Sequence, residues 1–402
     1  MKTDFLVIGA GVMGINVARE LKQRFADASV AVIDKENGCG RHSSGRNVGM
    51  VDAGFSWPAD SLKARFCKEG NEQLGRYCED RKLALNRCGE LVIARDDDEL
   101  SSLDGVQRRA ESNGVKLETV TAREAKEIEP RARVHEQALF FPTSAAVDPL
   151  AVLQQMEQDA RSVGVKFYYG NSYLRKAGDE LIATRGTIQA GYIVNCAGLH
   201  ADWIAQEFGF GTRYRMLPIK HSYLESSEPP GALRTHITAA GELFGSYPGV
   251  RIVLGVDGRP RLGPAVKPAL WREQYHGAGG FQPFEMSGVV KLGLSQMFQG
   301  GKEICRACLQ RFRGKAHSRL IAAGSRLAEG ISPNDYRDWA RPEIQPQLVD
   351  TETHRLVADF VVEGDGKSMH VLNTVSPAFT CGLPFARYVC EQIADRIGSG
   401  DE

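Results

Sequence analysis

Three glycines near the start of the chain have the spacing of a phosphate-binding turn. Gly9, Gly11 and Gly14 follow an apolar run, residues 4–8, and open a stretch whose apolar residues recur at helical spacing. In a strand–turn–helix unit of this kind, the first glycine makes the bend and the second lets the backbone approach a pyrophosphate. The third lets the helix pack closely on the sheet. The helix N-terminus then offers N–H groups to the phosphate charge.

An acid at a suitable distance supports this interpretation. A second apolar run, residues 29–33, ends in Asp34, twenty residues after Gly14. A carboxylate at this point would accept hydrogen bonds from ribose hydroxyls. The alternative, an ordinary tight turn between a strand and a helix, does not require the acid. The sequence therefore predicts a Rossmann-like dinucleotide-binding unit at the N-terminus.

The elements expected to hold this unit together are scattered along the chain. Asp148 and Pro149 form an N-cap and N1 pair for a helix over 150–162. A last helix is expected over 383–397, with Pro384 near its first turn. Further elements are expected as a helix over 61–78 and strands at 165–169, 181–184, 191–195 and 370–373. A cofactor that needs both the first and the last segment of the fold suggests FAD rather than NAD.

Residues 213–330 differ in character, because short apolar runs alternate there with Gly and Pro. This pattern predicts a mostly antiparallel sheet, with a helical part over 286–312. The fold class expected is α/β (α+β overall), in which a Rossmann-like domain is interleaved with a second, smaller domain. The expected boundaries are 1–85, 150–212 and 335–402 for the cofactor domain, and 86–149 and 213–334 for the substrate domain.

Composition limits the functions that need considering. The 402 residues include 50 Lys plus Arg and 50 Asp plus Glu, so no polyanionic partner such as a nucleic acid is indicated. No window approaches the roughly 18–20 apolar residues of a membrane span. The first expected strand begins at Asp4, which leaves no room for a cleavable signal, so we expect a cytoplasmic protein, with peripheral contact at the inner membrane left open.

The nine cysteines are odd in number and scattered, as in proteins with reduced thiols. Cys305 and Cys308 form a CxxC pair, but no second pair or neighbouring histidines complete a zinc site. We therefore expect two small residues one turn apart on a helix, and no metal.

The chain resembles FAD-dependent oxidoreductases of the D-amino-acid-oxidase superfamily, and within it the L-2-hydroxyglutarate oxidase/dehydrogenase branch. The resemblance covers nearly the whole length and is carried by residues 9–14, 42–54, 60–67, 88–89, 195–202 and 373–381. It implies a glutathione-reductase-type FAD domain and hydride transfer from substrate to flavin N5. The cofactor is expected to be held non-covalently, although some relatives attach flavin at the position of His42.

The resemblance also implies which residues bind FAD. Gly9, Gly11 and Gly14 would hold the pyrophosphate, and Asp34 the adenosine ribose. The helix expected over 383–397 would direct its N-terminus at the flavin C2 carbonyl and stabilise the anionic reduced flavin. The other residues implied are His42, Ser43, Ser44 and Gly45 on the flavin side, Ala197 and Gly198 near the adenosine, and Ser376, Pro377 and Ala378 beside the isoalloxazine.

The substrate half departs from the branch's pattern. Arg46 and Asp52 stand where the branch has histidines, and Arg251 replaces a third. The branch's Phe-Arg-Gly-Glu-Tyr stretch is rewritten here as residues 219–223, which include Lys220, His221 and Tyr223. Its Arg-Ala-Gln before the C-terminal strands becomes Gln-Pro-Gln at 345–347. These changes put L-2-hydroxyglutarate itself in doubt as the substrate.

The replaced residues suggest a chemistry. A small acid needs a cation for its carboxylate, and Arg46, Lys220 and Arg251 are candidates. An alcohol must lose its hydroxyl proton to a base, for which Asp52 or His221 could serve. With an amine substrate, Asp52 could instead hold an ammonium group.

Each of these residues also has a structural alternative. Asp52 could cap a turn before Gly54, and Arg46 could pair with it across the loop. His221 could be a satisfied sheet residue, and Tyr223 could belong to the core.

Three functions follow, in order of preference. The first is an FAD enzyme that oxidises a CH–OH or CH–NH group of a small carboxylate-bearing substrate, with oxygen or a quinone as electron acceptor. The second is an amino-acid or secondary-amine oxidase. The third is a flavoprotein that serves as a non-catalytic subunit. The sequence does not indicate an oligomeric state.

Overall fold

The computed structural model describes residues 1–243, 249–298 and 316–398. Cys305, Cys308 and the second half of the helix expected over 286–312 lie outside these ranges. None of the helices in the described ranges is long and apolar enough to cross a membrane.

The first sheet is built around parallel strands in the order β9-β2-β1-β12-β21. β1 is the apolar run that precedes the glycine turn, and its last residue, Ile8, pairs with both Ile33 and Asn195. Three antiparallel strands complete the sheet. The strands are β1 (Lys2–Ile8), β2 (Val30–Asp34), β9 (Lys166–Tyr169), β10 (Tyr173–Ala177), β11 (Glu180–Ala183), β12 (Gly186–Asn195), β20 (Val362–Gly364) and β21 (Ser368–Val371).

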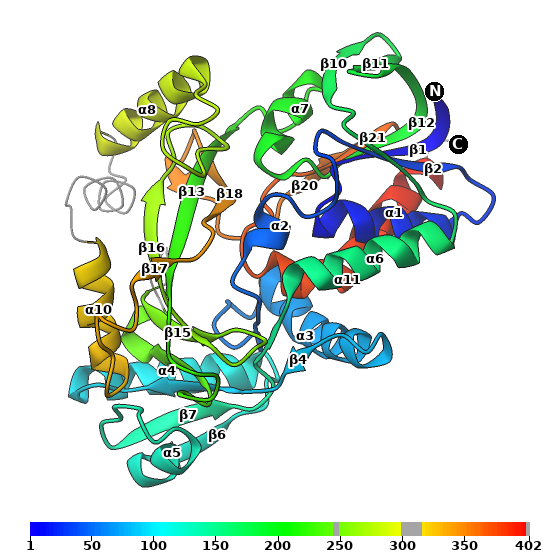
Figure 1. Cartoon of the computed structure of the whole chain (residues 1–402). Coiled ribbons are helices and arrows are strands. Elements are labelled where there is room, and N and C mark those ends of the chain that lie inside the picture. Colours follow the sequence, from blue (N-terminus) through cyan, green and yellow to red (C-terminus); the bar gives the residue numbers. More distant parts are fainter. Residues whose placement is uncertain (244–248, 299–315, 399–402) are drawn as a thin grey trace.

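Helices from both ends of the chain form one layer beside this sheet (Figure 1). They are α1 (Val12–Arg24), α3 (Leu62–Asp80), α6 (Pro149–Ser162) and α11 (Ala378–Gly398). Asp148 caps α6 by accepting a hydrogen bond from the Leu150 amide at 2.9 Å, which confirms the predicted cap. From the sequence we expect the first and last segments of the chain to form one unit, as in FAD-binding folds. They do so, because α11 packs on both α1 and α3.

The predicted position of Pro384 is wrong. α11 begins at Ala378, so Pro384 lies inside the helix, where its ring removes the amide that would bond the Thr380 carbonyl. Gly70 of α3 packs so closely on this carbonyl that a side chain there would run into it. The connection between the strand expected at 370–373 and the helix expected over 383–397 is thus shorter than predicted, because residues 378–382 are already helical.

The second sheet has ten strands, in the order β19-β18-β13-β16-β15-β14-β5-β7-β6, with β17 on β13. All its pairings are antiparallel except that of β14 with β5. The strands are β5 (Glu90–Ile93), β6 (Glu118–Thr121), β7 (Gln137–Phe141), β13 (Tyr214–Glu225), β14 (His236–Ala239), β15 (Arg251–Leu254), β16 (Pro260–Pro268), β17 (Asp338–Trp339), β18 (Glu343–Asp350) and β19 (Arg355–Leu356).

The mostly antiparallel character expected for this part is therefore confirmed. β18 and β19 belong to this sheet, whereas the sequence-based boundary at 335 groups them with the cofactor part. α5 (Ala122–Ile128) and α10 (Ala316–Leu327) pack against one face of this sheet, and α4 (Asp97–Ser112) packs against the opposite face at Val92. α8 (Pro283–Phe298) packs against Leu217 and Ile219 of β13.

Short elements connect the two sheets. α2 (Ser43–Arg46) is a single helical turn after the glycine-rich loop, and β3 (Met50–Val51) and β4 (Leu85–Asn86) flank β8 (Ala145–Val147) in a small third sheet. α7 (Ala201–Glu207) follows β12. Figure 1 shows α2 between the two large sheets, where the chain passes from the dinucleotide-type unit towards the ten-stranded sheet.

Candidate active site

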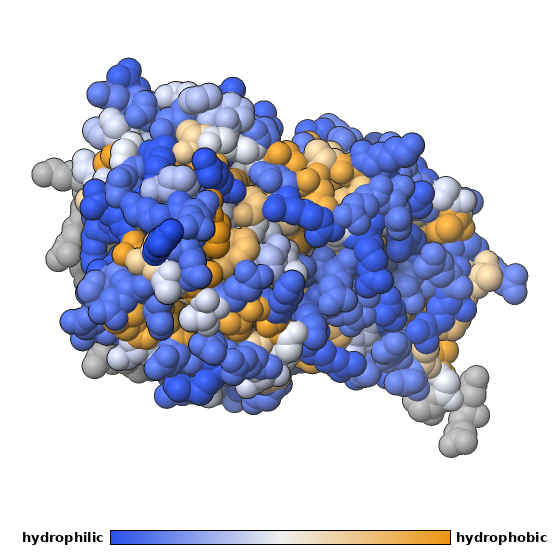
Figure 2. Space-filling model, turned by 90° about the horizontal axis from the view of Figure 1, so that it is seen from below, coloured by the Kyte–Doolittle hydropathy of each residue, from blue (hydrophilic) through white to orange (hydrophobic). Residues whose placement is uncertain are grey.

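A cavity of about 1160 Å³ lies between the two sheets. Its walls come from the turn after β1, the α2 segment, one face of β13, β15 and β18, and the loop before α11. Figure 2 shows apolar residues gathered in a hollow of one face, while most of the remaining surface is hydrophilic. A cavity of this volume accommodates a large cofactor together with a small substrate.

The glycine turn is shaped as the sequence predicts. Gly9 has φ of 107°, a conformation that favours glycine, and a side chain there would collide with the Cys196 carbonyl oxygen. A side chain at Gly14 would strike the Gly9 carbonyl oxygen. The segments that carry Gly9, Gly14 and Cys196 can approach one another this closely only because residues 9 and 14 are both glycines. Gly11 lines the cavity beside Ser44, whose hydroxyl accepts a hydrogen bond from the Val12 amide at 3.0 Å.

Asp34 lines the cavity at the end of β2. Its Oδ2 accepts a hydrogen bond from the Ala10 amide at 2.6 Å, and its Oδ1 accepts one from the Glu36 amide at 2.8 Å. The carboxylate therefore also fixes the shape of the glycine turn. Its role towards the adenosine ribose stays a prediction.

The α2 segment is fixed by internal hydrogen bonds. Ser43 Oγ donates to the Ile344 carbonyl of β18, which ties the segment to the second sheet. Gly45 packs against the Gly40 carbonyl with no room for a side chain. Asn47 donates to the Ser44 carbonyl at 2.8 Å and accepts from the Gly49 amide at 2.9 Å. The sequence analysis does not predict a role for Asn47. Its position as the C-cap of the α2 turn is the feature that could have indicated one.

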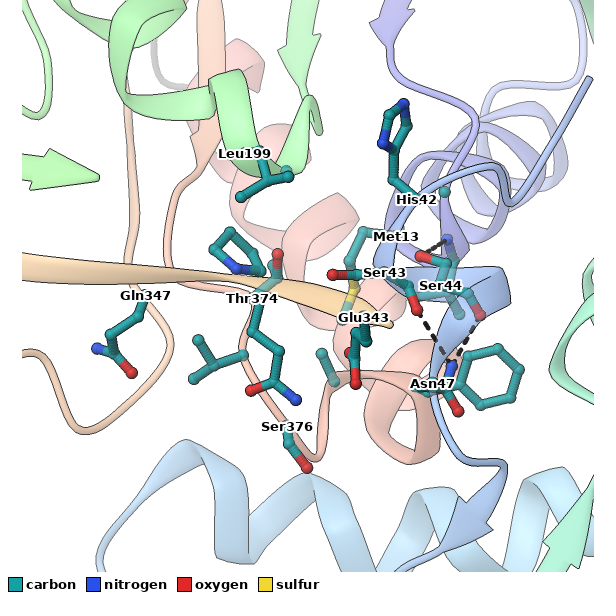
Figure 3. A pocket seen from close by; sticks show the side chains of 18 of the residues that line it. Met13, His42, Ser43, Ser44, Asn47, Leu199, Glu343, Gln347, Thr374 and Ser376 are labelled. Atoms are coloured by element: carbon teal, nitrogen blue, oxygen red, sulfur yellow. Dashed lines mark hydrogen bonds between the residues drawn. The ribbon is translucent and has the colours of Figure 1, made fainter. Parts of the chain in front are cut away.

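His42 lines the cavity, but its ring is held by neighbours. Nδ1 lies 2.8 Å from the Tyr275 hydroxyl, and Nε2 lies 2.9 Å from Glu36 Oε1 and 3.0 Å from Lys35 Nζ. Figure 3 shows the ring turned away from Ser43 and Glu343. The hydrogen bond from His42 is the main cause that lowers the pKa of Glu36 to about 2. An imidazole engaged at both nitrogens is poorly placed to bond a flavin.

The remaining implied cofactor residues also reach the cavity. Ala197 and Gly198 line it directly after β12. Ser376, Pro377 and Ala378 line it in front of α11, whose N-terminus therefore opens onto the cavity. A helix of this length carries a partial positive charge at that end, which suits an anionic ring system.

The face of the ten-stranded sheet carries the polar side chains of the cavity. His221 of β13 and Glu343 of β18 occupy directly paired positions, and both are buried and line the cavity. Figure 3 shows Glu343 between the segment with Asn47 and the loop with Ser376. Tyr223 follows on β13 and also lines the cavity, where burial raises its pKa to about 12.

Arg251 of β15 is the cation of this face. It lines the cavity, and no carboxylate lies within 4.0 Å of it in the described part of the chain. Its Nε is buried without a hydrogen-bond partner there, while Nη1 lies 3.9 Å from Met50 Sδ. Burial, with a smaller contribution from the charge of Arg251, lowers the pKa of His221 to about 4, so His221 is neutral at pH 7.

Two buried acids of the cavity were not predicted. Burial raises the pKa values of Glu90 and Glu343 to about 7. Glu90 accepts hydrogen bonds from Thr238 Oγ1 at 2.7 Å and from Ser144 Oγ at 3.2 Å. For Glu90 the available signal was an acid directly before the apolar residues 91–93, where a buried charge is costly unless it has a role.

Three of the predicted substrate residues have structural contacts instead. Asp52 lines the cavity, but its Oδ1 accepts from the Gly54 amide at 2.7 Å, so it caps the turn. The Arg46 guanidinium lies 4.2 Å from the Tyr275 ring centroid and does not line the cavity. Lys220 is buried outside the cavity and donates to the Tyr275 carbonyl at 2.6 Å.

The structure places Arg46 and Lys220 behind the cavity wall because both hold the segment around Tyr275. The alternative pairing of Arg46 with Asp52 is not formed either, since Arg46 Nε donates to the Arg41 carbonyl at 2.7 Å. Of the predicted substrate residues, His221, Tyr223, Arg251 and Asp52 share the cavity.

Fold and site together define a flavoprotein oxidoreductase. The glycine cradle, the acid after β2 and the helix terminus at the cavity fit a dinucleotide whose ring system lies against a polar sheet. The family model for DAO, FAD dependent oxidoreductase, matches residues 4–363, so the chain belongs to this family. Its cofactor is FAD.

Curated relatives cover nearly the whole chain. L-2-hydroxyglutarate dehydrogenase of Escherichia coli K12 is 26% identical over 408 residues, which is 98% of this chain and 94% of the relative. The mitochondrial L-2-hydroxyglutarate dehydrogenase of Homo sapiens is 26% identical over 430 residues, with 98% and 89% covered. The resemblance stated from the sequence is therefore confirmed.

Solved structures share the fold. L-alpha-glycerophosphate oxidase of Mycoplasma pneumoniae with FAD bound has a TM-score of 0.76 at 16% identity, covering 98% of this chain and 95% of that one. Glycine oxidase of Geobacillus kaustophilus has a TM-score of 0.73 at 18% identity, with the same coverage. The chain is therefore an FAD-dependent enzyme, and its substrate has to be argued from its own site.

Proposed function

We propose that the protein oxidises a CH–OH or CH–NH group of a small carboxylate-bearing substrate. The observation that carries this proposal is Arg251, a cation that faces the cavity without a carboxylate partner among the described residues. A buried guanidinium is strongly stabilised by a bidentate carboxylate. The relatives named L-2-hydroxyglutarate dehydrogenase support a substrate that carries this group.

The other side chains divide the work around the reacting carbon. FAD, when bound, supplies the hydride acceptor at N5. His221 is neutral at pH 7 and lines the cavity, so it accepts the proton from the substrate hydroxyl or amino group. Arg251 fixes the carboxylate and thereby orients the carbon, and Tyr223 lies beside both on the same sheet.

Oxidation of an amino acid or a secondary amine is a second candidate. The observation that favours it is the pair of buried acids, Glu90 and Glu343, which face the same cavity as Arg251. Acids and a cation in one cavity are complementary to a substrate with both an ammonium and a carboxylate group.

Anaerobic mixing of the FAD-loaded protein with matched pairs of substrates tests both candidates. Lactate is compared with alanine, and 2-hydroxyglutarate with glutamate, by the loss of flavin absorbance. Bleaching by the hydroxy acids alone supports the alcohol reaction, and bleaching by the amino acids alone supports the amine reaction. A protein that holds FAD and is bleached by neither class contradicts the proposal and favours a non-catalytic subunit. Reoxidation by air or by a soluble quinone then identifies the electron acceptor, which we expect to be one of these two.

A further inference from the structure

Trp203 is a large aromatic side chain that lines the cavity and is only partly covered by the protein. It lies in the first turn of α7 and is 43% exposed. Single exposed apolar side chains are common on protein surfaces and by themselves indicate no site. Trp339 of β17 is such a case, because it is 44% exposed and does not line the cavity. An indole that lines a cofactor cavity, by contrast, is available to stack on a planar ring.

A short series of contacts connects Trp203 with Asp34, the acid at the end of β2. The Asn171 amide donates a hydrogen bond to the Asp34 carbonyl at 2.9 Å. Tyr173, two residues further along the chain, packs edge-to-face against Trp203, with 6.2 Å between the ring centroids. Figure 1 shows α7, which carries Trp203, beside β10, which begins at Tyr173.

A second series of contacts ties the end of β2 to the start of α7. Lys35, which directly follows Asp34, has its Nζ 2.6 Å from Glu273 Oε1. The same carboxylate oxygen lies 3.0 Å from Nε2 of His200, the residue that directly precedes α7. Both series of contacts therefore place Asp34 and Trp203 at the same end of the cavity.

The wall of the cavity at this end contains several apolar side chains. The residues that belong to one buried apolar cluster and also line the cavity are Ile8, Ile33, Tyr173 and Ile204. The Tyr173 hydroxyl donates a hydrogen bond to Glu207 of α7 at 2.5 Å, which fixes its ring against the helix that carries Trp203. A pocket lined by branched and aromatic side chains suits a flat, apolar ring better than a charged group.

FAD carries a flat ring next to the group that Asp34 is expected to hold. The adenine is bonded directly to the adenosine ribose, so a ribose at Asp34 brings the adenine to this apolar end of the cavity. The flavin ring belongs to the other half of the dinucleotide, beyond the pyrophosphate expected at the glycine turn. We propose that the Trp203 indole stacks on the adenine of FAD and thereby retains the adenosine half of the cofactor. Trp203 takes no part in the reaction, so this inference is independent of the substrate.

Ligands that carry only one half of FAD test the inference without turnover. The full chain, freed of FAD by dialysis, is titrated with ADP, which has the adenosine half, and with FMN, which has the flavin half. Isothermal titration calorimetry gives each Kd. In the wild type we expect ADP to bind and to quench tryptophan fluorescence. Trp203→Leu should raise the Kd of ADP at least about tenfold, because stacking of a base on an aromatic side chain is lost, and leave the Kd of FMN unchanged within about twofold.

Two further variants keep the test decisive. Trp203→Phe retains a ring that can stack and should preserve most of the affinity for ADP, which separates loss of the ring from loss of structure. Trp339→Leu removes a tryptophan of similar exposure outside the cavity and should change neither Kd. The inference would be overturned if the wild type did not bind ADP, or if Trp203→Leu bound ADP as tightly as the wild type. Equal weakening of ADP and FMN in Trp203→Leu would also overturn it, because the effect would then not be specific to the adenine.

Discussion

His221 and Glu343 lie directly opposite each other on the neighbouring strands β13 and β18, and both side chains line the cavity. Opposite positions on adjacent strands direct their side chains to the same face. The imidazole and the carboxyl thus reach the same polar wall, although they are far apart in sequence. Burial lowers the pKa of His221 to about 4 and raises the pKa of Glu343 to about 7. At pH 7 the imidazole is therefore neutral, and the Glu343 carboxyl is partly protonated.

Replacement of His221 by Asn should remove the proton acceptor while the cavity is preserved. We expect kcat to fall by about 10²–10⁴, a usual range for the loss of general base catalysis. Flavin content should remain at the wild-type level. Stopped-flow measurement of flavin reduction with the best substrate of the panel gives the rate. His135→Gln is a matched control, because the His135 side chain is 40% exposed, bonds Asp97 at 2.9 Å and does not line the cavity. An unchanged reduction rate in His221→Asn would exclude the assigned role.

Replacement of Arg251 by Met should weaken the binding of every carboxylate substrate. The loss of a buried, charge-assisted pair costs roughly 2–3 kcal/mol, so kcat/KM should fall about 100-fold. Arg251→Lys should recover only part of this, since an ammonium cannot pair in the bidentate manner. Arg259→Met is the control, because Arg259 is more than half exposed and lies 3.8 Å from Asp257. The assignment fails if Arg251→Met and Arg259→Met give the same KM.

Glu343 should make the stability of the protein depend on pH. Burial raises its folded pKa to about 7, above the ordinary value of 4.5. Its contribution is therefore fully present below pH 4.5 and is lost as the pH rises through 7. Glu343→Gln cannot ionise, so relative to the wild type it should gain on the order of 3 kcal/mol of unfolding free energy between pH 4.5 and pH 8. Urea unfolding at both pH values measures this difference. Glu118→Gln, at an exposed position on β6, should show no such change.

FAD should be released when the protein is denatured. Both ring nitrogens of His42 lie within hydrogen-bond distance of protein groups, and its ring is turned away from Ser43 and Glu343. We therefore expect acid precipitation to leave a colourless pellet and a yellow supernatant, and a polypeptide mass equal to that of the sequence. A yellow pellet with a mass increased by one FAD would contradict the non-covalent prediction. His42→Ala would then show whether this residue is the point of attachment.

Local sequence signals predicted the cofactor half well, because its chemistry depends on short segments. The glycine turn and the Asp148 cap each act within a few residues, and Asp34 follows the turn at a characteristic distance, so spacing alone identifies them. The polar residues that the ten-stranded sheet contributes to the cavity were predicted only in part: His221 and Arg251 were predicted, but Glu343 was not. Glu343 reaches the cavity through the pairing of β13 with β18, which no local pattern encodes. Arg46 and Lys220 were assigned to the substrate because they replace family residues, but contacts with Tyr275 decide where their side chains lie.

Substitution of Gly14 by Ala should weaken both the fold and the binding of FAD. A methyl group at this position would run into the Gly9 carbonyl oxygen, so α1 would have to move away from the turn that we expect to hold the pyrophosphate. Overpacking of this kind costs about 1–3 kcal/mol, and we expect a lower Tm together with a lower flavin-to-protein ratio. Gly288→Ala provides the opposite case, because Gly288 lies exposed inside α8 with no atom near the added methyl group. That variant should gain about 0.5–1 kcal/mol from helix propensity and keep its flavin. Equal Tm and flavin content in Gly14→Ala and the wild type would show that α1 can shift without loss, and that the close approach at Gly14 is not needed for the cofactor.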